Sequence, residues 1–147
     1  MPIVEVQTNV ILDATAIEKL SLAFTEAMVS LLQHSQGDVS TYTCPRVFVS
    51  LSHASTRVDG SLQPAAQVVV RSATELSSQN KRELCERLVK LLASHCAISE
   101  ERVFLQITRV PAEEAYNVEF GCARSVADRL KNGVVPEPML AHAVSGD

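Results

Sequence analysis

After Met1 the chain reads Pro2-Ile3-Val4-Glu5-Val6-Gln7-Thr8-Asn9-Val10. The β-branched, partly alternating residues of this stretch predict a strand from Ile3 to Val10. Next, the pattern Thr15-x-x-Glu18 offers a capping box for a helix. That helix carries apolar residues at helical spacing, namely Ile17, Leu20, Phe24, Ala27, Leu31 and Leu32. A polar loop over residues 34–45 leads to a strand from Val47 to Leu51, which makes the first unit β-α-β.

The second half of the chain repeats this order of elements. A turn-rich connection over residues 52–64 precedes a strand from Gln67 to Ser72. The helix that follows has one apolar stripe, made of Leu84, Leu88, Leu91, Leu92 and His95. A last strand is predicted from Val103 to Ile107. The sequence therefore contains two tandem β-α-β units.

Two such units predict an α/β (α+β) fold with one four-stranded sheet. Right-handed crossovers would place both helices on the same face of that sheet. Strands as apolar as residues 67–70 and 103–105 are typical of strands that are buried on both sides. Because the two helices cover one face only, we expect self-association to cover the other face. This reasoning supports an oligomer without fixing the number of subunits.

Length and composition indicate one soluble globular domain, with 147 residues of which 46% are apolar and 20% are charged. Acidic and basic residues are mixed along the sequence and give a formal charge of −4, so we expect neither a nucleic-acid nor a membrane partner. No apolar run approaches the ~20 residues that span a bilayer, and the N-terminus lacks the pattern of a signal peptide. We therefore expect a cytoplasmic protein.

The sequence shows no pattern for a metal or a cofactor. Four cysteines without C-x-x-C spacing are expected to be reduced and structural, namely Cys44, Cys85, Cys96 and Cys122. Four histidines are scattered without ligand spacing, namely His34, His53, His95 and His142. On its apolar stripe, His95 is expected to be packed and hydrogen-bonded. There is neither a G-x-S-x-G motif nor a phosphate-binding glycine loop, which speaks against hydrolase and nucleotide functions.

Pro2 is the first candidate for a catalytic residue. If Met1 is removed, the nitrogen of Pro2 becomes a free secondary amine at the start of a buried strand. An α-amino group has a pKa of about 8, and burial lowers this pKa because it disfavours the charged form. The result would be a general base poised near neutral pH. If Met1 is retained, the same nitrogen belongs to an amide and is no base.

Four segments together resemble one protein family. They are Pro2 to Val10, the turn Gly60-Ser61-x-x-Pro64, the helix start Ser78-Gln79-Asn80-Lys81 and the stretch Ile98-Ser99-x-x-Arg102-Val103-Phe104. In order and spacing they are similar to the family of macrophage migration inhibitory factor and D-dopachrome tautomerase, in the tautomerase superfamily. The resemblance implies a homotrimer whose sheets form a barrel, with an active site around the N-terminal proline at each subunit boundary. It also implies a domain over residues 1–118. The C-terminal extension over residues 119–147 departs from the short ending of the family, and we expect it to pack on the trimer. Its residue pattern predicts a short helix from Cys122 to Lys131, with Gly133 as the stop.

The activity implied by this resemblance is keto-enol tautomerisation of a small α-keto acid such as phenylpyruvate, or of a dopachrome-like compound. Pro2 would move the proton. The family's active-site tyrosine, which comes from a neighbouring subunit, falls at Phe104, and an asparagine falls at Gln106. Phe104 cannot donate a hydrogen bond, whereas Gln106 keeps an amide donor. The backbone N–H at Ala73, next to Ser72, would hold the substrate.

One cation of the family is missing from this chain. Where the family has Gly-Lys-Pro, the sequence reads Gly37-Asp38-Val39, followed by an insertion. Arg71 is our first candidate to bind the substrate carboxylate, because superfamily dehalogenases and decarboxylases use arginines from this region and the guanidinium fork suits a carboxylate. The alternative for Arg71 is a plain surface ion pair. Further candidate anion anchors are Arg46, Arg57 and Arg109.

Two other functions stay open. The phrase Val110-Pro111-Ala112-Glu113-Glu114 and the long tail are similar to the cis-3-chloroacrylic acid dehalogenase branch, with Glu114 and Glu119 as candidates for water activation. In that case the proline would act as a general acid in hydration or dehalogenation of an unsaturated acid. The missing lysine and tyrosine would also fit a non-catalytic, cytokine-like binding protein. The C-x-x-C of macrophage migration inhibitory factor is replaced by Ala65-Ala66-Gln67-Val68, so no thiol oxidoreductase is expected.

Overall fold

The structure is a computed structural model that describes residues 2–35, 47–72, 75–111, 116–117 and 121–122. Its strands are β1 (Ile3–Thr8), β2 (Phe48–His53), β3 (Ala66–Ser72), β4 (Val103–Arg109), β5 (Tyr116–Asn117) and β6 (Gly121–Cys122). Its helices are α1 (Ala14–Ser35), α2 (Ser78–Cys96) and the short 3₁₀ helix η2 (Glu100–Arg102). Each of the four strands and both long helices predicted from the sequence is present. Cys122, where the tail helix was predicted to begin, lies in β6 instead, so that start was wrong.

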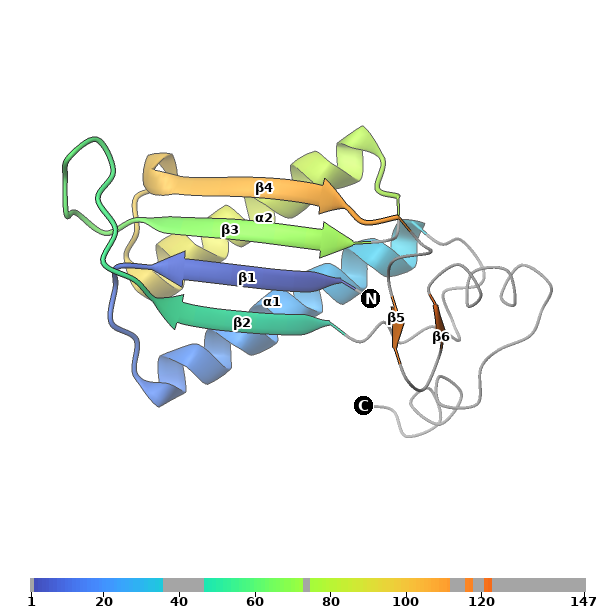
Figure 1. The fold of residues 1–147 in the computed structure, drawn as a ribbon, viewed down its shortest axis with the longest axis horizontal. Helices are drawn as coiled ribbons and strands as arrows, with labels where there is room; N and C mark the ends of the chain where they lie inside the picture. Colours follow the sequence, from blue (N-terminus) through green and yellow to red (C-terminus); the bar gives the residue numbers. More distant parts are fainter. Residues whose placement is uncertain (1, 36–46, 73–74, 112–115, 118–120, 123–147) are drawn as a thin grey trace.

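The main sheet has the strand order β2-β1-β3-β4. The outer pairs, β1 with β2 and β3 with β4, are parallel, whereas the central pair β1 with β3 is antiparallel. Two β-α-β units therefore lie side by side, running in opposite directions, and both helices lie behind the sheet (Figure 1). This arrangement confirms the predicted fold class. Within the described residues no helix is long and apolar enough to cross a membrane.

The hydrophobic core lies between the sheet and the two helices. Along β1, Val4 and Val6 are buried while the residues between them are more exposed, because successive side chains of a strand point to opposite faces. The core is filled by fully buried aliphatic and aromatic side chains, among them Leu20, Phe24, Val68, Val70, Leu84, Leu88 and Leu92. Each such side chain contributes about 1.5–3 kcal/mol relative to an exposed position.

The ends of the helices correct two details of the sequence analysis. The cap of α1 is Asp13, whose Oδ1 accepts the backbone N–H of Ala16 at 2.7 Å, so the predicted capping box at Thr15 and Glu18 is wrong. The helix α2 begins after Ser77, which accepts the N–H of Asn80 at 3.1 Å. At the end of α2 the buried residue is Cys96, whereas His95 is exposed. The prediction of a packed histidine was therefore wrong by one position on the helix.

The connection between β2 and β3 is tied to the sheet at two points. It turns through Asp59 and Gly60, both with positive φ (51° and 75°), as a tight two-residue turn requires. The side chain of Asn9 donates to the carbonyl oxygens of Thr56, Leu62 and Gln63 and accepts the N–H of Ala65. Arg102 donates from Nε to the carbonyl of Pro64 at 3.0 Å and from Nη2 to that of Gln63 at 3.1 Å. Asn9 and Arg102 thus hold the connection between β2 and β3 against the ends of β1 and β4.

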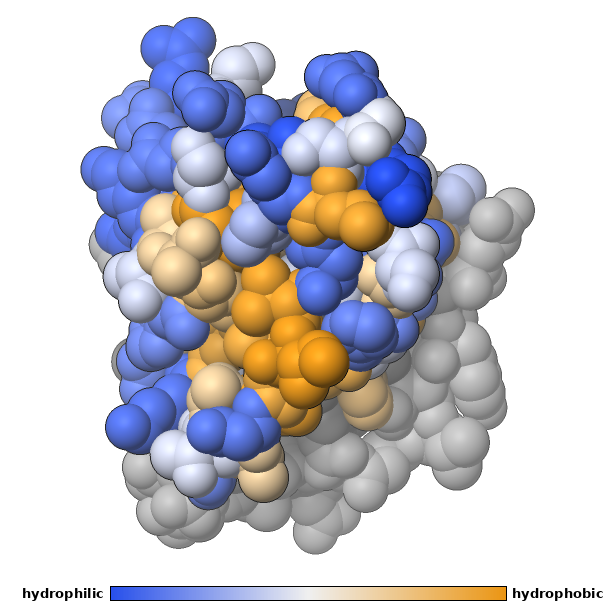
Figure 2. Space-filling view, turned by 90° about the vertical axis from the view of Figure 1, so that its left-hand side faces the viewer, coloured by the Kyte–Doolittle hydropathy of each residue, from blue (hydrophilic) through white to orange (hydrophobic). Residues whose placement is uncertain are grey.

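Apolar side chains also gather at the end of the molecule where β1 leads into α1, as Figure 2 shows. Two of the exposed apolar residues in segments at this end are Ile11 and Leu62, which are 84% and 58% exposed. This end lies opposite to Pro2, because β1 runs the length of the sheet between them (Figure 1).

The face of the sheet that turns away from the helices is mixed in character. The register and the alternation of exposure place on it Ile3, Glu5, Gln7, Phe48, Ser50, Ser52, Gln67, Val69, Arg71, Phe104, Gln106 and Thr108. We call these residues the uncovered face. The apolar runs over residues 67–70 and 103–105 place Gln67, Val69 and Phe104 on this face, because every second residue of a strand points this way. That a second subunit covers this face stays a prediction. Polar side chains outnumber apolar ones here, whereas the covered face is almost entirely apolar.

Candidate active site at the start of the first strand

Pro2 stands immediately before β1, one of the two central strands, and it is buried. Its carbonyl oxygen accepts the backbone N–H of Phe48 at 3.1 Å, which extends the pairing of β1 with β2 by one step. The ring is thereby fixed to the end of the sheet, and the φ of proline is fixed by the ring itself. A nitrogen at this position would point in one direction only, as a catalytic base must.

Arg71 lies beside this position on the neighbouring strand. In the antiparallel pair of β1 and β3, Arg71 is opposite Ile3, the residue after Pro2. Its Nη1 lies 2.8 Å from Oε2 of Glu5, and both side chains are nearly half exposed. The structure therefore places the candidate cation next to Pro2, and it also gives Arg71 the ion pair that was the alternative interpretation.

Ser72 follows Arg71 and is buried, with 2% of its surface exposed. Its carbonyl oxygen accepts the backbone N–H of Val110 at 2.9 Å, which holds the end of β3 against the chain that leaves β4. Antiparallel pairing continued by one residue brings Ser72 opposite Pro2. Ala73, the expected backbone donor, lies outside the described residues.

Phe104 and Gln106 are both on the uncovered face but far from Pro2 of their own chain. Arg71 is in register with Thr108, four residues along β4 from Phe104. At about 3.3 Å per residue and about 4.8 Å per strand spacing, Phe104 lies about 16 Å from Ile3 and Gln106 about 12 Å. One chain alone therefore does not bring these two residues to Pro2. The side chain of Phe104 is also half exposed, which makes it no part of the core.

Two of the remaining candidates make contacts of their own within the described residues. Arg57 donates to the carbonyl of Gly60 at 3.3 Å, within the turn between β2 and β3. Arg109 forms an exposed ion pair with Glu75 at 3.6 Å. Asp38, Arg46, Glu114, Glu119 and residues 123–131 of the expected tail helix lie outside the described residues. In the part of the chain that the structure describes, no three His, Cys, Asp or Glu side chains are grouped as metal ligands would be.

Comparison with known proteins bears on this arrangement. The family model described as macrophage migration inhibitory factor matches residues 1–121. The chain belongs to this family. No match was found among curated proteins.

Several solved structures share the fold of this member of the macrophage migration inhibitory factor family. The factor from the snail Oncomelania hupensis superposes with a TM-score of 0.70 at 20% identity, covering 99% of this chain and 95% of its own. Leishmania major MIF2 superposes with a TM-score of 0.63 at 22% identity, covering 75% of this chain and 89% of its own. Pt0534, solved after inactivation by 2-oxo-3-pentynoate, superposes with a TM-score of 0.65 at 16% identity, covering 84% of this chain and 98% of its own. At these identities the likeness concerns the fold.

Glu5 is a residue of the candidate site that the sequence did not predict, because its pattern indicated only a position in the first strand. Its carboxylate is the partner of Arg71. The available signal was the alternation in β1, because Glu5 is the one charged residue in a strand whose flanking positions, Val4 and Val6, are fully buried. A charged side chain between two core residues must project from the opposite face.

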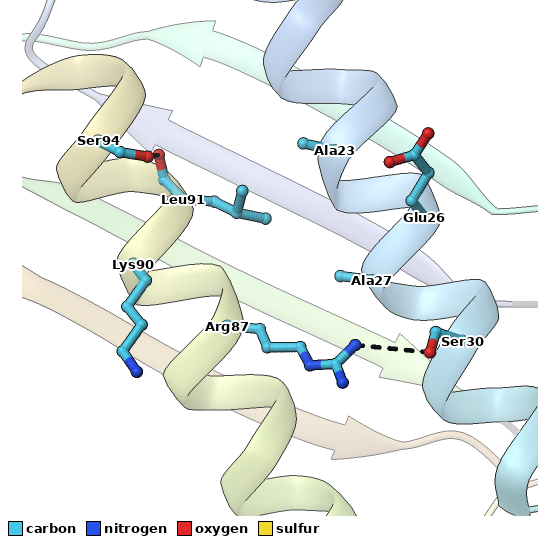
Figure 3. A pocket seen from close by; sticks show the side chains of 8 residues that line it. All are labelled: Ala23, Glu26, Ala27, Ser30, Arg87, Lys90, Leu91 and Ser94. Atoms are coloured by element: carbon cyan, nitrogen blue, oxygen red, sulfur yellow. Dashed lines mark hydrogen bonds between the residues drawn. The ribbon is translucent and has the colours of Figure 1, made fainter.

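A groove on the other side of this family member lies between α1 and α2 (Figure 3). Its volume is about 620 Å³, and it is lined by Ala23, Glu26, Ala27, Ser30, Arg87, Lys90, Leu91 and Ser94. Arg87 is held there by Glu83 at 2.6 Å and by the hydroxyl of Ser30 at 3.5 Å. The groove opens on the outer side of the helix layer, so the sheet separates it from the uncovered face (Figure 3).

Two cysteine thiols of α2 are free, Cys85 and Cys96. Burial raises the pKa of both thiols above the ordinary value of 9.0, and for Cys85 the carboxylate of Glu86 adds to this increase while a backbone hydrogen bond opposes it. Thiols with a raised pKa are protonated at neutral pH and are poor nucleophiles. Both therefore behave as structural residues, as the sequence analysis expects.

Proposed function

We propose that this member of the macrophage migration inhibitory factor family is a keto-enol tautomerase of small α-keto acids such as phenylpyruvate, or of dopachrome-like compounds. The observation that carries the proposal is the buried Pro2, fixed to the end of the central strand β1 in a chain of this family. Once Met1 is removed, Pro2 has a secondary amine in a site that disfavours its protonation. Such an amine takes a proton from the carbon next to a carbonyl group and returns it to the other end of the enolate.

The site needs groups from a second subunit. An enolate requires hydrogen-bond donors aimed at its oxygen. Gln106 can donate such a bond, but it lies about 12 Å from Ile3 in the same chain by the strand spacings given above. We therefore propose a homotrimer in which Gln106 and Phe104 of one subunit complete the site around Pro2 of the next. The mixed polarity of the uncovered face fits a surface that both contacts a neighbour and lines a wet site.

The carboxylate of the substrate would bind to Arg71. Its guanidinium offers five N–H donors, of which those on Nη1 meet Glu5. The apolar walls of the proposed site would be Ile3 and Phe104, which suit the aryl or alkyl part of the substrate. The proposed catalytic domain covers residues 1–118, with residues 119–147 as an extension.

The test uses protein from which removal of Met1 has been verified by mass spectrometry. We expect this protein to interconvert the enol and keto forms of phenylpyruvate, followed by ultraviolet absorbance. A protein that retains Met1 has an amide at the Pro2 nitrogen and should lose about 10²–10⁴-fold in rate, the usual contribution of a general base. Replacement of Pro2 by alanine keeps a primary amine but removes the ring that fixes its direction, so the rate should fall by a smaller factor. A rate unchanged in both variants contradicts the proposal.

Covalent trapping distinguishes the remaining functions. The relative Pt0534 was solved after inactivation by 2-oxo-3-pentynoate. An amine at Pro2 should add to this acetylenic keto acid, which would increase the mass of the N-terminal peptide in the Met1-free protein only. Trapping without phenylpyruvate turnover would favour a hydratase or dehalogenase of unsaturated acids. Neither trapping nor turnover would favour a non-catalytic binding protein.

A further inference from the structure

One ion pair links the two central strands beside Pro2. Nη1 of Arg71 and Oε2 of Glu5 are 2.8 Å apart, and the side chains are 41% and 46% exposed. Glu5 and Arg71 are diagonal neighbours, because Arg71 is opposite Ile3 and Glu5 is opposite Val69. Such diagonal neighbours on one face of a sheet are within reach of long side chains.

This pair changes the charge that an approaching substrate meets. Arg71 alone would give the position next to Pro2 a charge of +1, but Glu5 cancels it. An anion that binds to the guanidinium also comes close to the carboxylate of Glu5. Exposed ion pairs contribute little free energy, so an incoming carboxylate can replace Glu5 at Nη1 at small cost. A second carboxylate on the same ligand would meet the displaced Glu5, and it would be repelled.

We propose, on the basis of the proposed function, that Glu5 is the specificity-determining residue of this site and restricts it to monocarboxylic acids with an apolar remainder. Glu5 positions Arg71 in the free protein and yields Nη1 to one carboxylate of the ligand. Ile3 and Phe48, opposite each other on the uncovered face and 39% and 52% exposed, provide apolar surface beside the pair. Dicarboxylic α-keto acids are then poor ligands, because one of their two charges stays unpaired next to Glu5.

Replacement of Glu5 by glutamine keeps the size of the side chain and removes its charge. At this degree of exposure, repulsion between the carboxylate of Glu5 and a ligand carboxylate about 6 Å away would weaken binding by about 3- to 10-fold. We therefore expect Glu5→Gln to bind 3-phenylpropanoate, a monoanion that has no keto group and is not turned over, about 3- to 10-fold more tightly. Affinity for benzylmalonate, the same skeleton with a second carboxylate, should rise by a larger factor, and affinity for the neutral 3-phenylpropanamide should stay unchanged. Binding is measured by NMR titration of the full chain.

The matched control is Glu83→Gln, which removes the same charge from an ion pair with Arg87 at 2.6 Å and of similar exposure. That pair lies on α2, behind the sheet, so none of these ligands should bind differently. Arg71→Met should weaken the binding of 3-phenylpropanoate and leave that of 3-phenylpropanamide unchanged, because it removes the cation that the carboxylate is proposed to meet. Thermal unfolding of each variant verifies that it is folded.

The inference is overturned if Glu5→Gln binds 3-phenylpropanoate no more tightly than the wild type, or if neither protein binds it saturably. Phenylpyruvate turnover by the wild type is recorded separately and decides the proposed function. If the wild type turns over phenylpyruvate but Glu5→Gln and the wild type bind 3-phenylpropanoate equally tightly, only the role of Glu5 is refuted. If Glu5→Gln binds 3-phenylpropanoate more tightly but the wild type shows no turnover, the tautomerase is refuted and the role of Glu5 in selecting ligands by charge stands.

Discussion

Replacing Asn9 by alanine should destabilise the protein while leaving the Pro2 site intact. The side-chain amide of Asn9 reaches three carbonyl oxygens, those of Thr56 at 3.2 Å, Leu62 at 3.3 Å and Gln63 at 2.9 Å. Its Oδ1 accepts the N–H of Ala65 at 2.8 Å. Because the amide has only two N–H groups, the side chain makes about three effective hydrogen bonds.

The magnitude follows from these contacts. A hydrogen bond contributes about 0.5–1.5 kcal/mol net, which gives about 1.5–4.5 kcal/mol for three bonds. Two of the donor contacts are exposed to water, so the expected loss is in the lower half, about 2–3 kcal/mol. For a chain of 147 residues this lowers Tm by about 4–12 °C. Asn9 follows the end of β1 and is seven residues, about 23 Å, from Pro2, so carboxylate binding should not change.

Urea unfolding followed by circular dichroism measures this loss. Asn80→Ala is the matched control, because Asn80 donates its backbone N–H to the hydroxyl of Ser77 and this bond survives the substitution. A second arm combines Asn9→Ala with Arg102→Ala, since both side chains donate to the carbonyl of Gln63. The two effects should not add, with a coupling of at least about 0.5 kcal/mol. A loss below about 0.5 kcal/mol for Asn9→Ala would refute this account of the connection.

Three further predictions concern the core, the thiols and the site. Leu88→Ala, at a fully buried position of α2, should lower the free energy of unfolding in urea by about 2–5 kcal/mol. Leu22 is 59% exposed, so an equal loss for Leu22→Ala would contradict the packing described. Because burial raises the pKa of the Cys96 thiol above 9.0, the folded protein holds this proton more tightly than the unfolded chain. The contribution of Cys96 to stability is thus present below pH 9.0 and is lost as the pH rises above this value. Urea unfolding at about pH 8 and about pH 10 measures this loss. The decrease in the free energy of unfolding between the two pH values should be smaller for Cys96→Ala. Phe104→Tyr adds the hydroxyl that the resemblance implies at this position, and it should raise phenylpyruvate turnover by about 10-fold. An unchanged rate would contradict the proposal that Phe104 lines the active site.

Several features of this protein could be predicted from the sequence because they depend on local spacing. The strands, the helices and their order follow from residue periodicity. The same periodicity predicts that Val4 and Val6 point to the face of the sheet that packs against the buried residues of both helices. The prediction was less accurate at helix ends. Asp13 and Thr15 are both good capping residues, and the choice between them depends on where the chain turns away from β1. Successive residues on a helix differ in direction by about 100°, so Cys96 is buried whereas His95, one residue earlier, is exposed.

The sequence by itself determined that the chain forms two β-α-β units with Pro2 at the start of a buried strand. Only the tertiary structure decided what surrounds Pro2, because its neighbours come from residues far apart in the chain. Glu5 and Arg71 meet across the antiparallel pair of β1 and β3, and no periodicity within either strand reveals that pairing. The same register sets Phe104 and Gln106 at a distance from Pro2 of their own chain, since each strand crossed adds about 4.8 Å and each residue about 3.3 Å. Local spacing fixes which face a side chain occupies, whereas strand pairing fixes its neighbours on that face.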